Sequence, residues 1–201
     1  MNKISEARIE KIPYQNASLI THPATFMIKK TMEIGSIGSL VNENILQEFF
    51  HLQYSKKPLW LTPNVVFLGE IPRETTFEIE KPIGKTIINN IEKDDYILDD
   101  SALVIRMLEG LVVVTGCSHA GICNIINYAK KIFPENNVLD IIGGFHLLNP
   151  GREQLEGTID YLEKIAPNTI HACHCIDLPS KVALSKSLPL KEVGSGLKIE
   201  Y

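Results

Sequence analysis

The fold is decided by residues 103–133, which read LVIRMLEGLVVVTGCSHAGICNIINYAKKIF. Two runs rich in β-branched residues flank the dipeptide Glu109-Gly110, whose glycine suits the positive φ of a tight turn, so the stretch begins with a predicted β-hairpin. Its second half predicts an amphipathic helix that ends before Pro134, because apolar residues recur on one helical face. These residues are Ile122, Ile125, Ile126, Ala129 and Phe133.

The chain downstream of this stretch alternates between two kinds of pattern. Short apolar runs predict strands at residues 138–142 and 169–173, and helical stripes predict helices at residues 155–166 and 180–187. Residues 197–201 alternate as an edge strand does. Because strands and helices follow one another in turn, we predict a layered α/β fold.

The upstream half is less regular. It predicts short strands at residues 19–21 and 65–68 and a helix at residues 44–50. A chain of this length suits one domain. We therefore expect a single domain over residues 1–201, with an irregular β-rich part up to residue 100 and a regular α/β part from residue 101.

The composition excludes several classes of protein. The net charge is -4, with 20 basic and 24 acidic side chains, and gives no sign of a nucleic-acid or membrane-surface binder. No apolar run reaches the length of a membrane span, and the first residues lack the apolar core of a secretion signal. We therefore expect a cytoplasmic protein that binds neither nucleic acid nor membrane.

The four cysteines form two close pairs in the second half, Cys117 with Cys123 and Cys173 with Cys175. A disulfide framework would spread its cysteines over the chain, so we expect reduced thiols. By default they are small core residues. Cys117 and Cys175 could instead be soft ligands or thiols close to a metal.

Three histidines share one local context. His119, His146 and His174 each come shortly after a predicted strand, across small residues or directly. Side chains just past the carboxyl ends of neighbouring strands converge on one crevice in an open α/β sheet. Three imidazoles there could hold a metal and leave one position open for water or substrate.

The alternative is that each of these histidines is only a surface or hydrogen-bonded residue. The remaining histidines lack the same context: His22 and His51 are expected to be structural or solvent-facing, and His171 a packed core residue.

In the first half, one segment stands out, Gly69-Glu70-Ile71-Pro72-Arg73-Glu74. A guanidinium held by a proline-stiffened turn could grip a phosphate or carboxylate, which makes Arg73 a candidate substrate-binding residue with Glu70 beside it. An internal salt bridge from Arg73 to Glu70 or Glu74 is an equally good interpretation.

Several of these motifs together resemble a known family. TGCSHAGI at residues 115–122, IGGFHL at 142–147, HC at 174–175 and GEIPR at 69–73 are similar to the dihydropterin ribofuranosylaminobenzene phosphate synthase-like branch of the metallo-β-lactamase superfamily. Residues 21–26, THPATF, resemble the segment that follows the family's first metal motif. The likeness runs from about residue 19 to the C-terminus.

The resemblance implies an αββα sandwich with a metal site, usually a two-zinc site, at one edge of its sheets. It implies that His119 and His174 are metal ligands, with His146 lining the same pocket, and that the substrate is a phosphorylated small molecule. The reaction would be that of a metallohydrolase or transferase.

The sequence departs from the family at one place. The family's H-x-H-x-D-H motif should precede residue 19, and the chain contains no H-x-H. The resemblance thus implies a partial sandwich that lacks the N-terminal βαβ portion. The chain is then either the C-terminal portion of a longer or split reading frame or a degenerate member, with a complementing N-terminal fragment or a homo-oligomer as partner. A catalytically inactive domain that serves as a subunit or binding module is the alternative function, and we expect little activity from this polypeptide alone.

Overall fold

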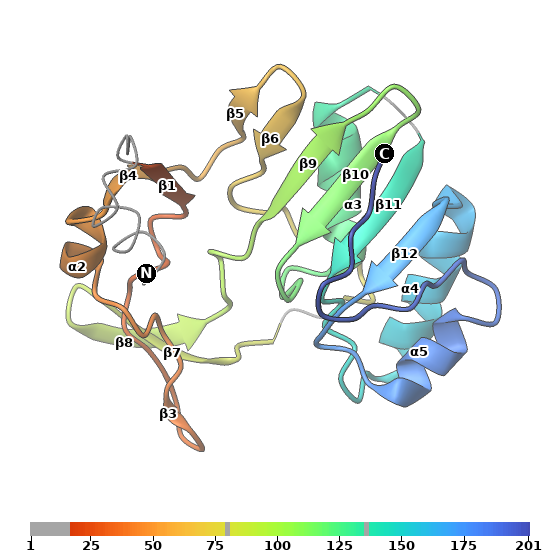
Figure 1. Ribbon diagram of the computed structural model, residues 1–201. Helices are drawn as coiled ribbons and strands as arrows, with labels where there is room; N and C mark the ends of the chain where they lie inside the picture. Colours follow the sequence, from red (N-terminus) through yellow and green to blue (C-terminus); the bar gives the residue numbers. More distant parts are fainter. Residues whose placement is uncertain (1–16, 79–80, 135–136) are drawn as a thin grey trace.

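A computed structural model describes residues 17–78, 81–134 and 137–201. Its centre is a sheet with the strand order β12-β11-β10-β9-β6-β5 (Figure 1). The strands are β5 (Leu59–Thr62), β6 (Val65–Phe67), β9 (Ala102–Arg106), β10 (Leu111–Thr115), β11 (Val138–Gly143) and β12 (Thr169–Ala172). β10, β11 and β12 run parallel, and the other neighbours pair antiparallel. Three carboxyl ends therefore meet at one edge of the sheet.

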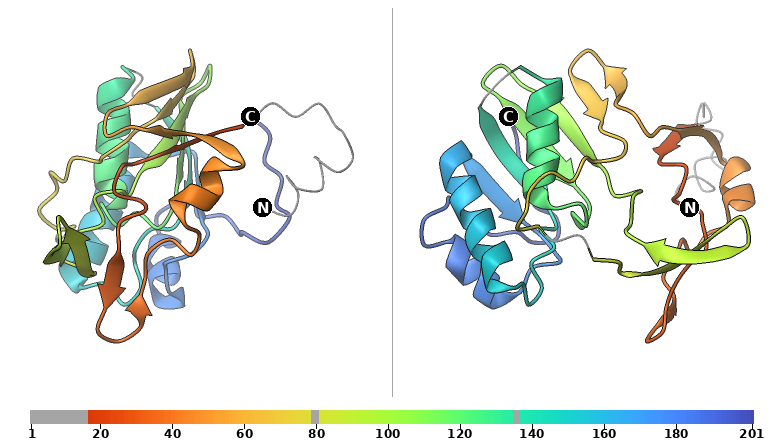
Figure 2. Two further views of the ribbon diagram at one scale, coloured as in Figure 1. Left: turned by 90° about the vertical axis from the view of Figure 1, so that its left-hand side faces the viewer. Right: turned by 180° about the vertical axis from the view of Figure 1, so that it is seen from behind.

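Helices cover one face of this sheet. α3 (Ile122–Ile132) and α4 (Arg152–Ile165) lie on the side that faces the viewer when the molecule is seen from behind (Figure 2). The buried Leu184 of α5 (Leu178–Leu184) joins the same core cluster as Leu162 of α4. The predicted helical stripe of α3 is buried against the sheet, where Ile125 and Ala129 pack with Val104 and Val113. The α/β prediction, the hairpin and the strand-helix alternation after residue 101 are confirmed.

Glu78, which no sequence pattern singled out, fixes the start of α3. Gly121 precedes the helix at φ 95° and offers no side chain to cap it. The buried Glu78 carboxylate instead accepts hydrogen bonds from the backbone N–H groups of Cys123 (2.8 Å) and Asn124 (3.0 Å) and from the Thr75 hydroxyl (2.8 Å). A Cβ at residue 121 would collide with this carboxylate, which explains the glycine.

The first half builds two smaller sheets beside the main one. One has the order β3-β2-β7-β8, and the other pairs β1 with β4 in parallel. Their strands are β1 (Ala17–Thr21), β2 (Lys29–Thr31), β3 (Gly35–Ser36), β4 (Phe50–Tyr54), β7 (Gly84–Ile88) and β8 (Ile91–Asp95). The predicted strands at 19–21 and 65–68 are confirmed. The helix predicted at 44–50 is α2 (Glu43–Gln47), which ends early because Phe50 begins β4.

The predicted edge strand at residues 197–201 is wrong. Leu190 forms an isolated bridge with Ile170, and the tail then leaves the sheet edge and crosses the face opposite α3 (Figure 1). There the Tyr201 hydroxyl donates a hydrogen bond to Asp140 (2.5 Å) instead of joining a ladder. In the described ranges no helix is long and apolar enough to cross a membrane.

Candidate functional site

The loops after β10, β11 and β12 carry His119, His146 and His174, as the sequence predicts. Each loop also contains at least one non-glycine residue in the left-handed conformation: Ser118 (φ 62°) after β10, His146 (φ 50°) and Asn149 (φ 48°) after β11, and Cys175 (φ 49°) after β12. Such residues cost conformational energy and cluster at functional sites. The carboxyl edge of the sheet therefore holds several residues with this unusual backbone.

His119 and His146 lie against each other. Their ring centroids are 4.5 Å apart with an interplanar angle of 52°. His119 Nδ1 is buried and has no hydrogen-bond partner. Burial lowers the pKa of both imidazoles, and the neighbouring His119 lowers that of His146 further. Both rings are thus neutral near pH 7, which is the form that binds a metal.

Asp100 holds the His119 loop in place. Its buried carboxylate accepts a hydrogen bond from the N–H of Ala120 (2.9 Å) and is also bonded by the N–H of His119. Burial raises the pKa of Asp100. On the other side of the loop, the Ser118 hydroxyl donates to the carbonyl of Gly144 (2.5 Å), which ties the β10 loop to the β11 loop.

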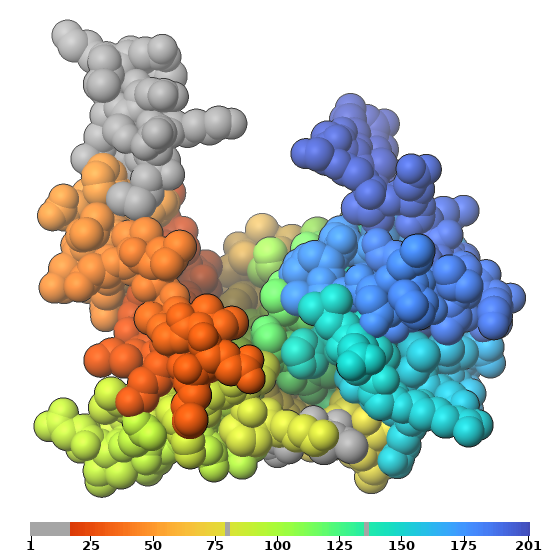
Figure 3. All heavy atoms as spheres, turned by 90° about the horizontal axis from the view of Figure 1, so that it is seen from below, coloured from red at the N-terminus to blue at the C-terminus, as the bar shows by residue number. Residues whose placement is uncertain are grey.

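His119 and His146 also line a pocket of about 420 Å³. Its wall includes the positively charged residues Arg73, Lys81 and Arg152, with Glu153 from the start of α4. In Figure 3 the yellow-to-lime segment lies along the molecule between the orange part of the chain and the teal and blue part. A pocket of this size and charge suits a small anionic molecule.

The structure places the two candidate substrate-binding residues differently. The Arg73 guanidinium lines the pocket and donates to the backbone carbonyls of Tyr96 and Ile97. Glu70 is not on the pocket wall: its carboxylate contacts the buried His22 (3.2 Å) and Lys56 (3.7 Å). Glu70 thus has a structural contact, and His22 is structural as expected.

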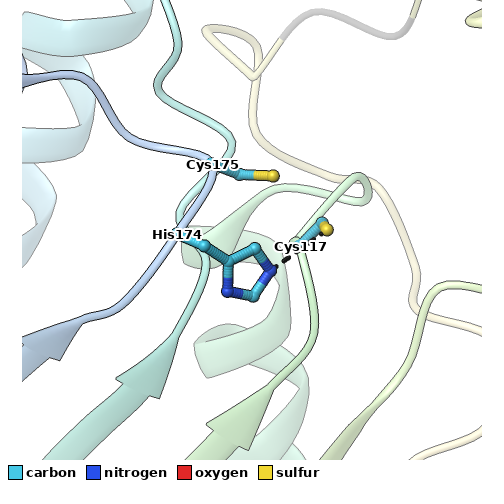
Figure 4. A group of neighbouring side chains, drawn as sticks. All are labelled: Cys117, His174 and Cys175. Carbon is cyan, nitrogen blue, oxygen red and sulfur yellow. Dashed lines mark hydrogen bonds between the residues drawn. The ribbon is translucent and has the colours of Figure 1, made fainter. Parts of the chain in front are cut away.

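His174 lies in a different group from the other two histidines. Its Nε2 is 3.2 Å from Cys117 Sγ, and Cys175 points toward the same spot (Figure 4). The three ligand atoms all lie within 4.8 Å of one another, the one such group of three in the described ranges. Burial, and the nearby Cys175, raise the pKa of Cys117 to about 11.

The predicted histidine trio is thus divided: His119 pairs with His146, and His174 faces two thiols. The signal for the thiols was present, because Cys117 stands two residues before His119 and Cys175 directly follows His174. His171 is a core residue as expected. It is buried, and its Nδ1 lies 2.7 Å from Asp140 Oδ2.

Comparisons with known proteins agree with this architecture. No protein-family model matches the sequence. The chain is 30% identical over 171 residues to 7,8-dihydropterin-6-methyl-4-(beta-D-ribofuranosyl)-aminobenzene-5'-phosphate synthase of Methanocaldococcus jannaschii, covering 78% of this chain and 56% of that protein. It is 28% identical over 173 residues to the uncharacterized protein MJ0448 of the same organism, covering 85% and 63%. The chain thus spans about three fifths of these relatives.

The structural comparison fixes the fold. The crystal structure of Tm1679, a metal-dependent hydrolase of the β-lactamase superfamily, superposes with a TM-score of 0.81 at 22% identity. The match covers 98% of this chain and 84% of that one, so the expected partial nature of the sandwich is not evident from it. We conclude that the chain has the metallo-β-lactamase fold and is a distant relative of the archaeal dihydropterin phosphate synthase.

Proposed function

We propose that this chain is a metal-dependent enzyme, or part of one, that acts on a phosphorylated small molecule. One observation carries the proposal: His119, His146 and Arg73 line the same pocket of about 420 Å³ at the carboxyl edge of the main sheet. Ligand pockets in open α/β sheets lie at this edge. Imidazole donors and a guanidinium in one pocket suit a metal and a phosphate together.

The metal that the fold implies fits the residues present. His119 Nδ1 is buried without a partner beside a second neutral imidazole, so a donor atom is left for a cation. His119 and His146 would hold zinc, the metal expected from the sequence, whereas His174 lies with Cys117 and Cys175. When bound, it would polarise a substrate oxygen or activate a water molecule.

The pocket wall supplies the charge that a phosphate needs. Arg73, Lys81 and Arg152 bring three positive charges to the wall, and Glu153 brings one negative charge. Arg152 also pairs with Glu156 (2.8 Å), so Arg73 and Lys81 are the main candidates for binding a phosphate. Arg73 is positioned for this role because two backbone carbonyls fix its guanidinium. The name of the archaeal relative offers one candidate chemistry, the synthesis of a dihydropterin compound that carries a ribose 5'-phosphate.

A second candidate function is a catalytically inactive domain that acts as a subunit or binding module. The lack of any H-x-H in the sequence favours it, because the resemblance assigns half the metal ligands to that motif. Its partner would be a complementing N-terminal fragment or a second copy of the chain.

One experiment separates the two functions. Purified protein with added zinc is tested for binding of pyrophosphate by calorimetry and for phosphate release from pyrophosphate and sugar phosphates. If the chain is an enzyme, we expect it to bind pyrophosphate and to release phosphate. Turnover should be lost in His119→Ala and kept in His51→Ala, whose side chain is exposed. Binding without turnover supports the inactive module, and the absence of both rejects the pocket as a phosphate site.

A further inference from the structure

We infer that Cys117, His174 and Cys175 form a zinc site of their own, beside the pocket but separate from the His119–His146 pair. The inference goes beyond the proposed function, which needs no thiol. The three side chains come from the loops after β10 and β12 and converge on one point (Figure 4).

The spacing of the three ligand atoms suits a zinc ion. Zinc–sulfur and zinc–nitrogen bonds of ~2.3 and ~2.05 Å in a tetrahedron place neighbouring ligand atoms about 3.5–3.8 Å apart. Cys117 Sγ and His174 Nε2 are 3.2 Å apart, and all three atoms lie within 4.8 Å of one another. Small side-chain rotations therefore suffice to surround an ion.

The backbone around the three ligands is already fixed. The N–H of Gly144 donates to the carbonyl of Gly116 (2.7 Å), and the N–H of Leu147 donates to that of Cys175 (2.7 Å). These bonds join the three loops to one another. A Cβ at Gly144 would lie 2.8 Å from His174 Nε2, so the glycine leaves room for the imidazole. A site on such a scaffold binds without first ordering its loops.

The chemistry of the donors selects the metal. Two thiolates and an imidazole prefer zinc or copper(I) to magnesium or calcium, which bind oxygen. Zinc would displace the two thiol protons to solvent, and its double charge would be balanced by the two thiolates. Three protein ligands leave a fourth position for water or substrate, as in catalytic rather than structural zinc sites. His174 is exposed, so this position is open to solvent.

Cobalt(II) tests the site, because cysteine ligands give cobalt a thiolate charge-transfer absorption that histidine ligands cannot give. Reduced, metal-free protein is titrated with cobalt and then with zinc. We expect one thiolate-bound cobalt per chain, displaced by zinc. Cys117→Ser and Cys175→Ser should each reduce the absorption and weaken zinc binding by about tenfold or more.

Cys173→Ser is the matched control, because Cys173 lies between His171 and His174 but outside the cluster, with its thiol bonded to the carbonyl of His171. Cys173→Ser should bind cobalt and zinc as tightly as wild type does. His119→Ala should keep the absorption, although the proposed pocket chemistry is lost. The inference would be overturned if wild type lacked the absorption. It would also be overturned if His119→Ala lost the absorption while the cysteine variants kept it.

A measurement on unaltered protein guards against variants that fail to fold. Wild-type protein is treated with N-ethylmaleimide with and without zinc, and the modified cysteines are mapped by mass spectrometry. Zinc should protect Cys117 and Cys175 and leave the exposed Cys173 reactive. Equal modification of all three cysteines with zinc present contradicts the site.

Discussion

The ring of His146 lies 4.5 Å from that of His119, centroid to centroid, although 27 positions separate them in the chain (146 minus 119). Parallel pairing of β10 with β11 brings the two loops together. The contact also leaves His119 Nδ1 buried without a hydrogen-bond partner. A metal ion held by both rings, as we propose, would give this nitrogen a partner.

His146→Asn tests this pair without disturbing the backbone, because asparagine tolerates the left-handed conformation that His146 adopts. We expect zinc affinity to fall about tenfold or more, with the melting temperature nearly unchanged. Equilibrium dialysis measures the affinity. His51→Asn, at an exposed position, should bind as wild type. Unchanged affinity in His146→Asn would remove this residue from the metal site.

Arg73→Gln should weaken the binding of pyrophosphate by about tenfold or more, because a charge-assisted hydrogen bond contributes about 1.5–3 kcal/mol. Isothermal titration calorimetry gives the affinity. Arg106→Gln is the control, since Arg106 bonds to Asn64 (3.0 Å) outside the pocket. If both variants bind pyrophosphate equally well, Arg73 is a structural residue that only holds the 96–97 backbone.

Glu78→Ala should lower the free energy of unfolding by about 1–2 kcal/mol, because it leaves two N–H groups at the start of α3 without their acceptor. Urea denaturation measures the loss. Glu163→Ala, on the exposed face of α4, should unfold like wild type. A loss no larger than in Glu163→Ala would show that the helix start does not depend on this carboxylate.

The raised pKa of Glu78 makes the free energy of unfolding depend on pH. Burial raises its pKa above the ordinary 4.5, so the folded chain keeps this proton where the unfolded chain has lost it. The unfolded state then binds fewer protons, and the contribution of Glu78 to stability falls as pH rises from about 4.5 through its raised pKa. Glu78→Gln, which cannot ionise, should lose less stability over this window than wild type. Parallel curves of stability against pH would contradict the shift.

Tyr201→Phe tests the contact of the tail with the main sheet. Loss of the hydroxyl removes one hydrogen bond to the buried Asp140, whose carboxylate also bonds His171. We expect a cost of about 1–3 kcal/mol in the free energy of unfolding. Tyr54→Phe, whose hydroxyl bonds to Glu43 at the surface, should cost less. Equal costs would mean that the tail adds little to stability.

Local patterns predicted the second half of the chain well. The stripe of α3 and the β-branched arms of the hairpin are each confirmed, because burial on one face leaves a periodic trace in the sequence. The prediction for the tail was wrong because residues 197–201 have no strand partner, and Tyr201 instead bonds to the buried Asp140. Alternation alone does not reveal the partner.

The site was predicted only in part. The position of His119, His146 and His174 after parallel strands follows from the strand pattern, and the structure confirms that position. Left-handed residues such as Ser118 and Cys175, and hydrogen bonds between loops such as Ser118 to Gly144, determine which of the histidine and cysteine side chains lie together. These backbone conformations and hydrogen bonds depend on tertiary contacts. The spacing of residues in the sequence therefore did not predict the grouping of Cys117, His174 and Cys175, or the hydrogen bonds from the His119 loop to Asp100.

The metal content of purified protein is the most direct test of whether the carboxyl edge of the main sheet binds metal. Wild type and the double variant His119→Ala/His174→Ala are loaded with zinc, freed of excess by gel filtration and measured by inductively coupled plasma mass spectrometry. We expect at least one zinc per wild-type chain and little in the double variant. Equal zinc in the two proteins would contradict the account.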